Sequence, residues 1–499
     1  MRYVAGIDVG TSGVKCILVG EDGHVAASQT RTYSLSNPHE GWSEQNPADW
    51  WEGTCGAMKA AVEQSGVAAA DIAGLSFSGQ MHGLVALDGD DNVIRPAILW
   101  NDQRTEKECE EIIAAAGGLD GLLSYTNNTM LTGYTGGKIL WMKKNEPDNF
   151  ARMKHFLMPK DYIRFLITGE KCTEVSDGSG TGLFNVEKRA FSFELIDLLG
   201  FDKTMFPSVM ESDGLAGHVT KEAAALTGLP EGLAVYAGGG DAVIQTTGMG
   251  IVKEGTIGFI IGTSGVVSMA LDGFGYNENG LVQFFCNNDK NKWQAFGCQL
   301  SSGGSMEWFK NTFYDGADDP FKLINAGAEA SQPGANGVIF LPYLTGERAP
   351  HADPYARGVF YGMSVTTTRG DLARAVMEGV VFGLREIYEL ILSAKPGMKP
   401  TEVVSSGGAS KSRLWRQIQA DIMGLPVKTL TGAAEGGAYG AAVVAGVGAG
   451  LWGSIEEAAK MLKVETITQP IPENVEKYNR IIKTYSGLYQ DLKQRFREL

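Results

Sequence analysis

One short glycine-rich motif occurs twice in the chain, and its residue types suit the binding of phosphate groups. The sequence Gly-Thr-Ser-Gly-Val stands at residues 10–14 and again at residues 262–266 of the 499 residues. Each copy lies between two apolar runs, which predicts a strand, a tight turn and a second strand. Backbone N–H groups and hydroxyls at such turns approach phosphate oxygens closely. A single copy is also compatible with a plain β-hairpin, but the pair predicts one phosphate site built from two related halves.

The expected phosphate ligands come from both copies of the motif. Thr11 and Ser12 offer backbone and hydroxyl donors in the first copy, and Gly262 and Thr263 offer them in the second. Lys15 follows the first turn, where it either reaches a phosphate or lies on its strand as a solvent-facing lysine. We expect these five residues to bind a nucleotide.

A single acid distinguishes the two copies. Asp8 precedes the first turn, whereas Ile260 stands at the same place before the second. A carboxylate at the end of a buried strand is costly unless it is paired or bound to a cation. We therefore predict that Asp8 holds a Mg²⁺ ion through water, because Mg²⁺ keeps several of its waters. The plainer alternative is an aspartate that caps its own turn.

A second acid is a candidate general base. Asp241 follows the glycines at residues 238–240 and begins a predicted helix of small residues that ends at residue 249. The positive end of the helix dipole favours an ionised carboxylate there, and the glycines let a substrate approach. We predict that Asp241 takes a proton from the substrate and contacts it. An ordinary N-cap aspartate is the alternative.

Two further strings combine aromatic and polar side chains in the way that sugar recognition requires. Residues 80–83 end a predicted buried strand, and residues 100–104 place a tryptophan beside amide and charged groups. An apolar face with a few aimed polar groups is typical of a small-molecule site. The alternatives are a histidine satisfied within the core and a helix start that is capped by Asp102. The substrate-binding residues that we expect are Gln80, Met81, His82, Trp100 and Asp241.

A glycine turn in the second half offers a place for a nucleoside. Gly407 and Gly408 precede a predicted helix that runs to residue 421. The sequence contains neither a P-loop lysine motif nor a complete dinucleotide-binding fingerprint. A nucleotide must therefore be held by separate glycine turns rather than by one continuous loop.

These motifs require a repeated α/β architecture to position them. Three predicted strands at residues 3–31 are followed by a strand leading into the glycine turn at 79–83 and another leading into 238–241. The same order of elements returns after residue 250. A hairpin comes first, then a strand that leads into a glycine loop, and then a glycine loop that leads into a small-residue helix. Strands that alternate with helices indicate an α/β fold. We expect an N-terminal domain at residues 1–250 and a C-terminal domain at residues 251–499.

Composition excludes several other classes of protein. The chain is 43% apolar and 20% charged, with a net charge of −15, so we expect it to bind neither nucleic acid nor membranes. Its six cysteines are widely spread and form no Cys-x-x-Cys pair, which is typical of free thiols in a reducing compartment. The first residues show no secretory signal pattern. We therefore expect a cytoplasmic protein.

The motifs together resemble the FGGY carbohydrate kinases of the sugar kinase, actin and heat-shock ATPase superfamily. The likeness covers nearly the whole chain, and the string at residues 346–358 is its most specific part. The other matching strings lie at residues 6–15, 41–47, 79–83, 99–104, 135–141, 238–241 and 407–417.

The resemblance implies two RNase H-like domains of the actin/hexokinase superfamily, α/β in class, with a central cleft between them. It implies phosphoryl transfer from ATP, with Mg²⁺, to the terminal hydroxyl of a ketopentose, D-xylulose above all. By similarity, Asp241 takes the hydroxyl proton, and Met81 and His82 contact the sugar. The resemblance assigns the sugar and the base to residues 1–250 and ATP to residues 251–499. We expect a homodimer as the assembly, although the sequence leaves the oligomeric state open. The ATP contacts implied are Thr263, Gly303, Glu307, Gly408 and Ser412.

Departures from the family pattern concern the substrate. Ala242 stands where many pentulose kinases carry Asn or Gln, and Gly133 replaces a larger residue that glycerol kinases use. Ser406 stands where glycine is common. These changes leave ATP use intact and keep ribulose, another polyol or gluconate open as the acceptor. A more distant alternative is an actin-like ATPase, which would hydrolyse ATP without a sugar.

Overall fold

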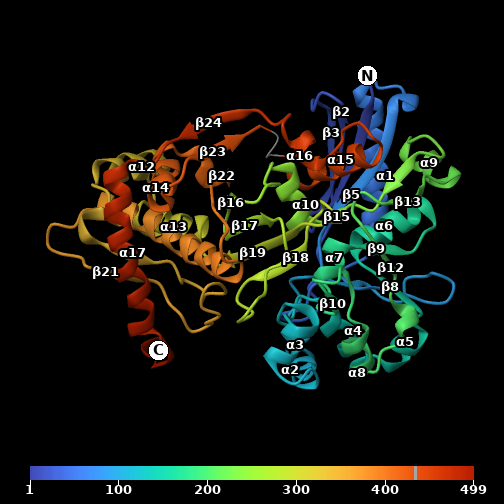
Figure 1. The fold of residues 1–499 in the computed structure, drawn as a ribbon, viewed down its shortest axis with the longest axis horizontal. Coiled ribbons are helices and arrows are strands. Elements are labelled where there is room, and N and C mark those ends of the chain that lie inside the picture. The colour runs from blue at the N-terminus through green and yellow to red at the C-terminus, as the bar shows by residue number, and fades with distance from the viewer. Residues whose placement is uncertain (432–434, 499) are drawn as a thin grey trace.

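The computed structural model describes residues 1–431 and 435–498, and two sheets organise it (Figure 1). The first sheet belongs to the N-terminal half and the second to the C-terminal half. In spatial order the first sheet contains β13 (Leu215–His218), β14 (Ala234–Tyr236), β5 (Ile72–Gly79), β1 (Tyr3–Val9), β2 (Gly13–Gly20) and β3 (Val25–Thr32), with β15 (Gly239–Gly240) beside β5. The second contains β18 (Gln283–Cys286), β19 (Trp293–Gln299), β17 (Gly265–Leu271), β16 (Thr256–Ile261), β22 (Glu402–Gly407), β23 (Val427–Leu430) and β24 (Val464–Thr468).

The two sheets share one topology. In the first, β1, β2 and β3 form an antiparallel meander, β5 and β14 continue it in parallel, and β13 closes it antiparallel. In the second, β16, β17 and β19 form the meander, β22 and β23 lie parallel, and β24 closes the sheet antiparallel. The predicted internal repeat and the two-part α/β architecture are therefore confirmed.

The identical pentapeptides form hairpins of different length. In the first hairpin Val9 pairs with Val14, so residues 10–13 make the turn, whereas Ile261 pairs with Gly265 and leaves residues 262–264. The turn hydrogen bond follows this shift. The N–H of residue 10 donates to the carbonyl of residue 13 at 3.0 Å, and that of residue 262 donates to the carbonyl of residue 264 at 3.0 Å. The two halves of the expected phosphate site are therefore related but not identical.

Helices cover both faces of the first sheet. Helix α1 (Pro47–Ser65) packs on β2 and β3, and the side chain of Asn46 caps it by accepting the N–H of Ala48 at 3.2 Å. The other face is covered by α15 (Gly436–Gly448), which comes from the C-terminal half. A boundary at residue 250 thus separates the two sheets, but α15 follows that boundary and still packs on the first sheet.

Small residues in α15 are required by close approach of the backbone. A Cβ atom on Gly6 of β1 would overlap the carbonyl oxygen of Ala438. Helix α10 (Asp241–Gly248) crosses α15 at similarly short range, since a Cβ on Gly440 would overlap the carbonyl of Ile244. The glycine- and alanine-rich helices predicted from the two repeats therefore meet each other between the sheets.

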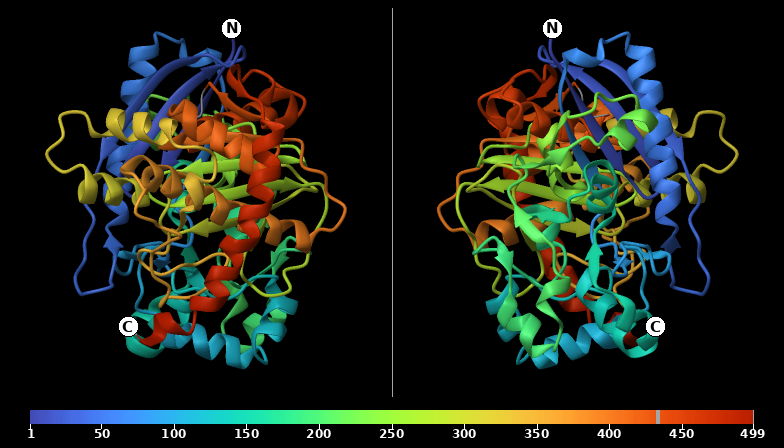
Figure 2. Two further views of the ribbon diagram at one scale, coloured as in Figure 1. Left: turned by 90° about the vertical axis from the view of Figure 1, so that its left-hand side faces the viewer. Right: turned by 90° about the vertical axis from the view of Figure 1, so that its right-hand side faces the viewer.

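The remaining helices that shape the site lie around these sheets. Helix α17 runs along the outside of the C-terminal half (Figures 1 and 2). None of the described helices is long and apolar enough to cross a membrane. The C-terminal half contains α11 (Gly303–Phe313), α12 (Pro320–Ala330), α13 (Arg369–Ala394), α14 (Arg413–Met423) and α17 (Pro472–Leu492), and the N-terminal half contains α4 (Thr135–Asn145), α6 (Pro159–Thr168) and α7 (Val175–Ser179).

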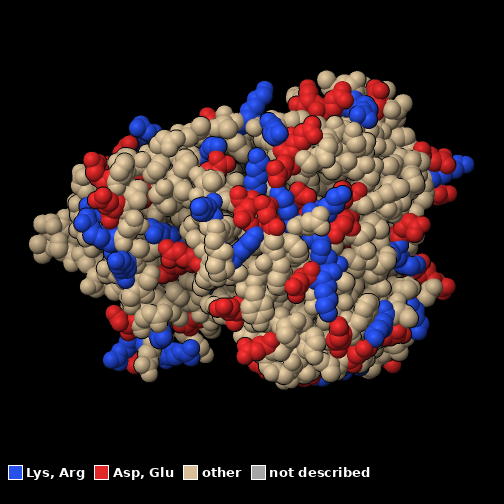
Figure 3. Space-filling view, in the orientation of Figure 1, with Lys and Arg blue, Asp and Glu red and all other residues tan. Residues whose placement is uncertain are grey.

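The charged side chains at the surface and the state of the cysteines are as the composition predicts. Acidic and basic side chains are interspersed on the face shown in Figure 3. All six cysteines are free thiols, and burial raises the pKa of the Cys16 thiol. Thiols that are protonated and buried in this way are unreactive and contribute to packing.

Candidate active site

The two acids singled out from the sequence lie at one edge of the first sheet. In the register of the strands, Asp8 of β1 lies beside Ser78 of β5, and Ser78 lies beside Gly239 of β15. Neighbouring strands are separated by about 4.8 Å, so the start of α10 lies two strand spacings from Asp8. The charge of Asp8 accordingly raises the pKa of Asp241. Both carboxylates belong to one site.

Asp241 has the electrostatics of a general base. Burial raises its pKa to about 7, the charge of Asp8 adds to this rise, and the N–H groups of Ala242 and Met81 lower it. Asp241 is the first residue of α10, and no side-chain hydrogen bond caps this helix. The N-cap alternative is therefore wrong. A carboxylate with a pKa near the working pH is well suited to proton transfer.

Each glycine before Asp241 is required by a neighbour. Gly238 has a φ of 88°, which side chains rarely adopt, and a Cβ there would also overlap the carbonyl of Phe77. A Cβ on Gly240 would overlap the side chain of Met81, which is 2% exposed. Met81 therefore packs against the loop that carries the base, and its side chain is buried in the core.

The side chain of Asp8 is half-buried, and Ser78 and Lys15 both interact with its carboxylate. The hydroxyl of Ser78 donates to its Oδ1 at 2.6 Å. Burial raises the pKa of Asp8, while this hydrogen bond and the charge of Lys15 lower it. A Cβ on Gly437, at the start of α15, would lie 3.0 Å from Asp8 Oδ1. The carboxylate thus faces the positive end of a helix.

The donor set around Asp8 fits a magnesium ion that is bound mainly by a nucleotide. Among the described residues, no group of three or more His, Cys, Asp or Glu side chains could hold a metal. Mg²⁺ typically takes one or two carboxylates and fills its other positions with water and phosphate oxygens. Asp8 can supply such a carboxylate, and the rest must come from the nucleotide and solvent.

The first hairpin is held by a network of side chains that includes three predicted ligands. Trp100 is 47% exposed, and its Nε1–H donates to Thr11 Oγ1 at 2.9 Å. The Thr11 hydroxyl in turn donates to Gln80 Oε1 at 3.2 Å. The Gln80 amide is buried and donates to Gln45 Oε1 at 3.1 Å. Gln80 therefore supports the turn from behind, whereas Trp100 faces solvent.

The remaining predicted ligands of the first hairpin differ in exposure. Ser12 is exposed at the tip of the turn. Lys15 is half-buried, and its Nζ lies 3.2 Å from Glu435 Oε2, just before α15 begins. The lysine is thus directed to the interface between the halves rather than to open solvent.

A cavity of about 470 Å³ brings both halves of the chain together at the predicted sugar site. His82 and Trp100 line it from the N-terminal half, while Glu347 and Arg348 line it from the C-terminal half. His82 Nδ1 lies 2.7 Å from the carbonyl of Gly180, which can only accept, so Nδ1 carries the proton. Burial, and then the charge of Lys138, lower the pKa of His82 to about 3. Its Nε2 is therefore an acceptor for a hydroxyl.

Glu347 and Arg348 are functional candidates that sequence reasoning missed. Glu347 Oε1 accepts the N–H groups of Leu300 at 2.9 Å and of Arg348 at 2.7 Å. Its Oε2 is buried and has no partner within the described residues, and burial raises the pKa of Glu347 to about 8. Arg348 is exposed, and its charge lowers the pKa of His82. The string 346–358 is the strongest family signal, but its spacing alone does not indicate a pocket wall.

Lys138 is a third residue that sequence reasoning missed, and it binds the backbone of Gly133. The Lys138 ammonium is fully buried and donates to the carbonyls of His82 and Gly133, each at 2.6 Å. A Cβ on Gly133 would overlap the carbonyl of Trp100. Glycine at position 133 is therefore needed so that two walls of the sugar cavity can touch.

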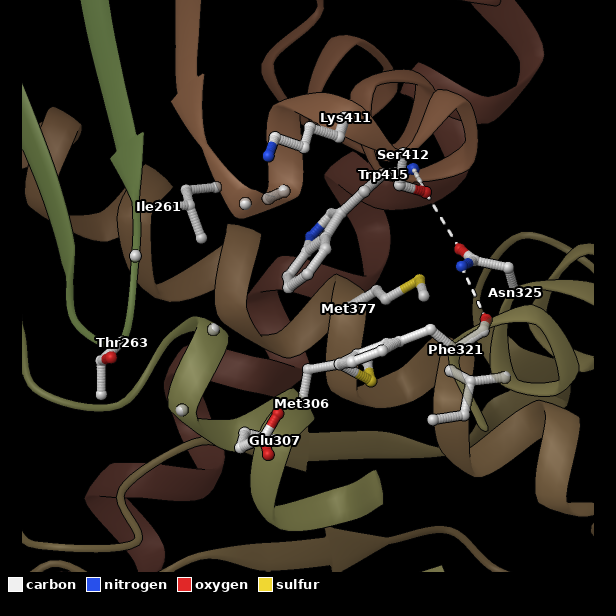
Figure 4. Close-up of a pocket in the computed structure, with 16 residues that line it drawn as sticks. Ile261, Thr263, Met306, Glu307, Phe321, Asn325, Met377, Lys411, Ser412 and Trp415 are labelled. Carbon is white, nitrogen blue, oxygen red and sulfur yellow. Dashed lines mark hydrogen bonds between the residues drawn. The ribbon is translucent and has the colours of Figure 1, made fainter. Parts of the chain in front are cut away.

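A second cavity, of about 840 Å³, lies in the C-terminal half and contains most of the predicted ATP ligands (Figure 4). Its apolar wall consists of side chains that suit a planar base, namely Met306, Phe321, Met377 and Trp415. The predicted residues that line it are Gly262, Thr263, Gly303, Glu307, Gly408 and Ser412.

Glycine is required where this cavity meets the second hairpin. The N–H of Gly303, at the start of α11, donates to the carbonyl of Gly262 at 2.8 Å, and a Cβ on Gly303 would overlap the same carbonyl. Gly407 has a φ of 84° and packs on the carbonyl of Ile261. A Cβ on Gly408 would meet nothing within 4 Å, so this glycine borders open space.

Two predicted ATP ligands have structural partners of their own. Ser412 Oγ donates to Asn325 Oδ1 at 3.0 Å and accepts the N–H of Trp415 at 3.3 Å, so it caps α14. Glu307 forms an ion pair with Lys310 on the same helix. The Trp415 indole N–H, which sequence reasoning missed, is buried without a partner among the described residues.

Both halves of the chain match models of one protein family. The model of the N-terminal domain of the FGGY family of carbohydrate kinases matches residues 3–248, and that of the C-terminal domain matches residues 258–449. A Bacillus subtilis protein named xylulose kinase is 41% identical over 494 residues, which cover 99% of this chain and 98% of that protein.

Solved structures are similar over the whole chain. A xylulose kinase from Rhodospirillum rubrum has a TM-score of 0.92 at 28% identity and covers 99% of this chain and 100% of its own. A gluconate kinase from Lactobacillus acidophilus has a TM-score of 0.91 at 25% identity and covers 98% of each chain. These matches confirm the predicted two-domain fold of the actin/hexokinase superfamily. The chain therefore belongs to the FGGY family of carbohydrate kinases and is an ATP-dependent sugar kinase.

Proposed function

We propose that this sugar kinase phosphorylates the terminal hydroxyl of a ketopentose, converting D-xylulose to D-xylulose 5-phosphate. The observation that carries the proposal is the position of Asp241, a half-buried carboxylate with a pKa near 7. It directly follows β15, which lies beside Ser78, the hydrogen-bond partner of Asp8. His82 lines the sugar cavity, and the backbone N–H of the adjacent Met81 donates a hydrogen bond to the Asp241 carboxylate. The relative from Bacillus subtilis bears the name of the same activity.

In the proposed mechanism, the two halves of the chain bind different substrates. ATP binds in the C-terminal cavity with its triphosphate toward the two glycine hairpins, and the sugar binds beside His82 and Trp100. Closure of the halves excludes water from the site. Asp241 accepts the proton of the terminal hydroxyl as the hydroxyl oxygen bonds to the terminal phosphorus of ATP. The bond between that phosphorus and the bridging oxygen breaks, and ADP leaves. Asp8 would hold Mg²⁺, which would supply positive charge to the phosphate oxygens.

The other site residues take binding or supporting roles in this proposal. Thr11, Ser12 and Lys15 present the first hairpin to the phosphates, and Gln80 keeps that hairpin in place. Residues 1–250 then supply the base and most of the sugar cavity, and residues 251–499 supply the nucleotide cavity. The first hairpin and the pair Glu347 and Arg348 cross this division, because the hairpin serves the phosphates and the pair lines the sugar cavity. The free thiols support a reducing, cytoplasmic setting. The homodimer stays a prediction.

Gluconate is the second candidate acceptor, because one feature of the cavity favours an anion. Arg348 is an exposed cation in the wall, while a lowered pKa keeps His82 neutral at physiological pH and burial raises the pKa of Glu347, which favours its protonated form. A carboxylate group would pair well with a guanidinium there. The similar fold of a gluconate kinase is consistent with this alternative.

A panel of acceptors tests the proposed function. We expect D-xylulose to give the highest kcat/KM in a coupled assay of ADP release, above D-ribulose, xylitol, glycerol and gluconate. A pocket built to hydrogen-bond a given set of oxygens rejects analogues that leave those groups unpaired. Preference for gluconate would replace the ketopentose, and ADP release at the same rate without any sugar would favour an actin-like ATPase.

The pKa of Asp241 predicts the pH dependence of the reaction. A general base acts after it has lost its proton, so kcat/KM for the sugar should fall tenfold per unit as pH decreases below about 7. Above that pH the carboxylate is ionised, and this limb of the profile should level off. Rates measured across this range provide the check, and a profile that is flat through pH 7 would remove Asp241 from the role of base.

A further inference from the structure

One residue of the C-terminal half reaches into the loop that carries the proposed base. Asn288 lies between β18 and β19 and is 1% exposed. Its Nδ2 donates to Ser212 Oγ at 2.9 Å and to Ser176 Oγ at 3.4 Å. Its Oδ1 accepts from the hydroxyl of Thr247, on α10, at 3.3 Å. All three partners belong to the N-terminal half.

The Asn288 amide lies directly on the strand that ends at the base. A Cβ on Gly239 would overlap Asn288 Nδ2, so the amide packs against that glycine without space between them. The next residue, Gly240, donates its N–H to Ser176 Oγ at 3.0 Å. Asn288 and its partner Ser176 therefore contact both residues of β15, and Asp241 follows immediately.

The partners of Asn288 are fixed by a buried carboxylate. Glu174 Oε1 accepts from Ser176 Oγ at 2.9 Å, and Glu174 Oε2 accepts from Ser212 Oγ at 3.1 Å. Glu174 is fully buried, and Lys160 Nζ lies 3.4 Å from its Oε1. Charges at this depth are tolerated when they are paired and hydrogen-bonded. Both serine hydroxyls donate to Glu174, so their oxygens are free to accept from Asn288 and Gly240.

On its other side, Asn288 is joined to the strands of the ATP half. Strand β19 pairs with β17, and Gln299 lies opposite Gly265 at the end of the second glycine hairpin. The adjacent strand β18 is fastened to the N-terminal half, since the N–H of Cys286 donates to Ser179 Oγ at 3.1 Å. The position of the base is thus set against the sheet that carries one of the two phosphate turns.

We propose that Asn288 is a positioning residue for Asp241, holding β15 and the start of α10 so that the base keeps its place relative to the second glycine hairpin. The proposal rests on the proposed function, in which Asp241 takes the proton of the sugar. In this proposal, residues from both halves of the enzyme determine the position of the Asp241 carboxylate. The sugar half supplies the carboxylate, and the ATP half supplies the amide that orients it.

The test compares two adjacent asparagines. Asn288→Ala should lower kcat about 10–100-fold, because a small displacement of a reacting group is that costly, and leave KM for ATP unchanged. Asn287→Ala is the matched control, since Asn287 is 2% exposed but its Nδ2 donates to Gln294 Oε1 at 2.6 Å, within its own hairpin. Equal losses of kcat in the two variants would overturn the proposal.

A second measurement separates positioning of the base from general damage. Asn288→Ala is introduced into the Asp241→Asn variant, where no base remains to be positioned. Residues that act as a unit are strongly non-additive, so the double variant should keep the kcat of Asp241→Asn within about twofold. A further loss as large as that caused by Asn288→Ala alone would show a merely structural role and contradict the proposal.

The outcomes distinguish failure of this proposal from failure of the proposed function. Full activity of Asp241→Asn would refute the base itself, whereas low activity of Asp241→Asn with full activity of Asn288→Ala would refute only the role of Asn288. If Asn288→Ala does not fold, as judged by its thermal unfolding, Ser176→Ala replaces it. That variant removes the acceptor for the Gly240 N–H and should reproduce the loss of kcat, the unchanged KM for ATP and the non-additivity with Asp241→Asn.

Discussion

Replacing Asp241 by Asn is expected to lower kcat by about 10²–10⁴-fold, which is the usual contribution of a positioned proton acceptor. The amide preserves the size of the side chain and the start of α10 but cannot take a proton. KM for ATP should change little, because the nucleotide cavity lies in the other half and does not include residue 241. Steady-state kinetics with saturating sugar and varied ATP measure both quantities.

Asp88→Asn is a suitable control for this experiment. Asp88 also lies in the N-terminal half, but its carboxylate accepts the N–H groups of Asp90 and Asn92 in a surface turn. We expect wild-type kinetics from this variant. Wild-type turnover in Asp241→Asn would mean that another group takes the proton, and the mechanism proposed here would have to be abandoned.

The second large effect is expected at Asp8. Asp8→Asn should lower kcat about 10²–10³-fold at a fixed Mg²⁺ concentration, the range found when one electrostatic stabiliser of a transition state is removed. An amide is a weaker ligand than a carboxylate for a hard cation, so the Mg²⁺ concentration needed for half-maximal rate should rise. Titration of Mg²⁺ at saturating ATP and sugar measures this shift.

Two features make the Asp8 experiment specific. Ser78→Ala removes the hydrogen bond to Asp8 but keeps the carboxylate, so its loss of activity should be much smaller. Removing the charge of Asp8 should also lower the pKa of Asp241, and the acid limb of the pH profile should move to lower pH. An unchanged Mg²⁺ requirement in Asp8→Asn would assign Asp8 to the turn alone.

The arrangement of the two acids could be predicted because it depends on backbone repeats. Asp8 and Asp241 each follow a buried strand and stand beside glycines, and such strands of one sheet end at a common edge. The internal repeat likewise predicted the two sheets and the pair of small-residue helices. The one-residue difference between the hairpins could not be foreseen, because the pentapeptides are identical and the register depends on the pairing of the whole strands.

The roles of individual side chains were less predictable. Gln80 is next to Met81 and His82 in sequence, yet its amide is buried behind the first hairpin. Glu347 and Arg348 line the sugar cavity from a segment far along the chain. Tertiary contacts decide these positions, and a single sequence contains no local periodicity that reports them. Sequence reasoning therefore located the loops of the site more reliably than the direction of their side chains.

A structure of the complex with D-xylulose and a non-hydrolysable ATP analogue is the most direct test of the account. We predict an Asp241 carboxylate oxygen within about 2.6–3.2 Å of the terminal hydroxyl of the sugar, with that hydroxyl in line with the terminal phosphate. The phosphate should lie between the hairpins at residues 10–13 and 262–264. A sugar bound with its terminal hydroxyl directed away from Asp241, beside a different acid or base, would contradict the central claim.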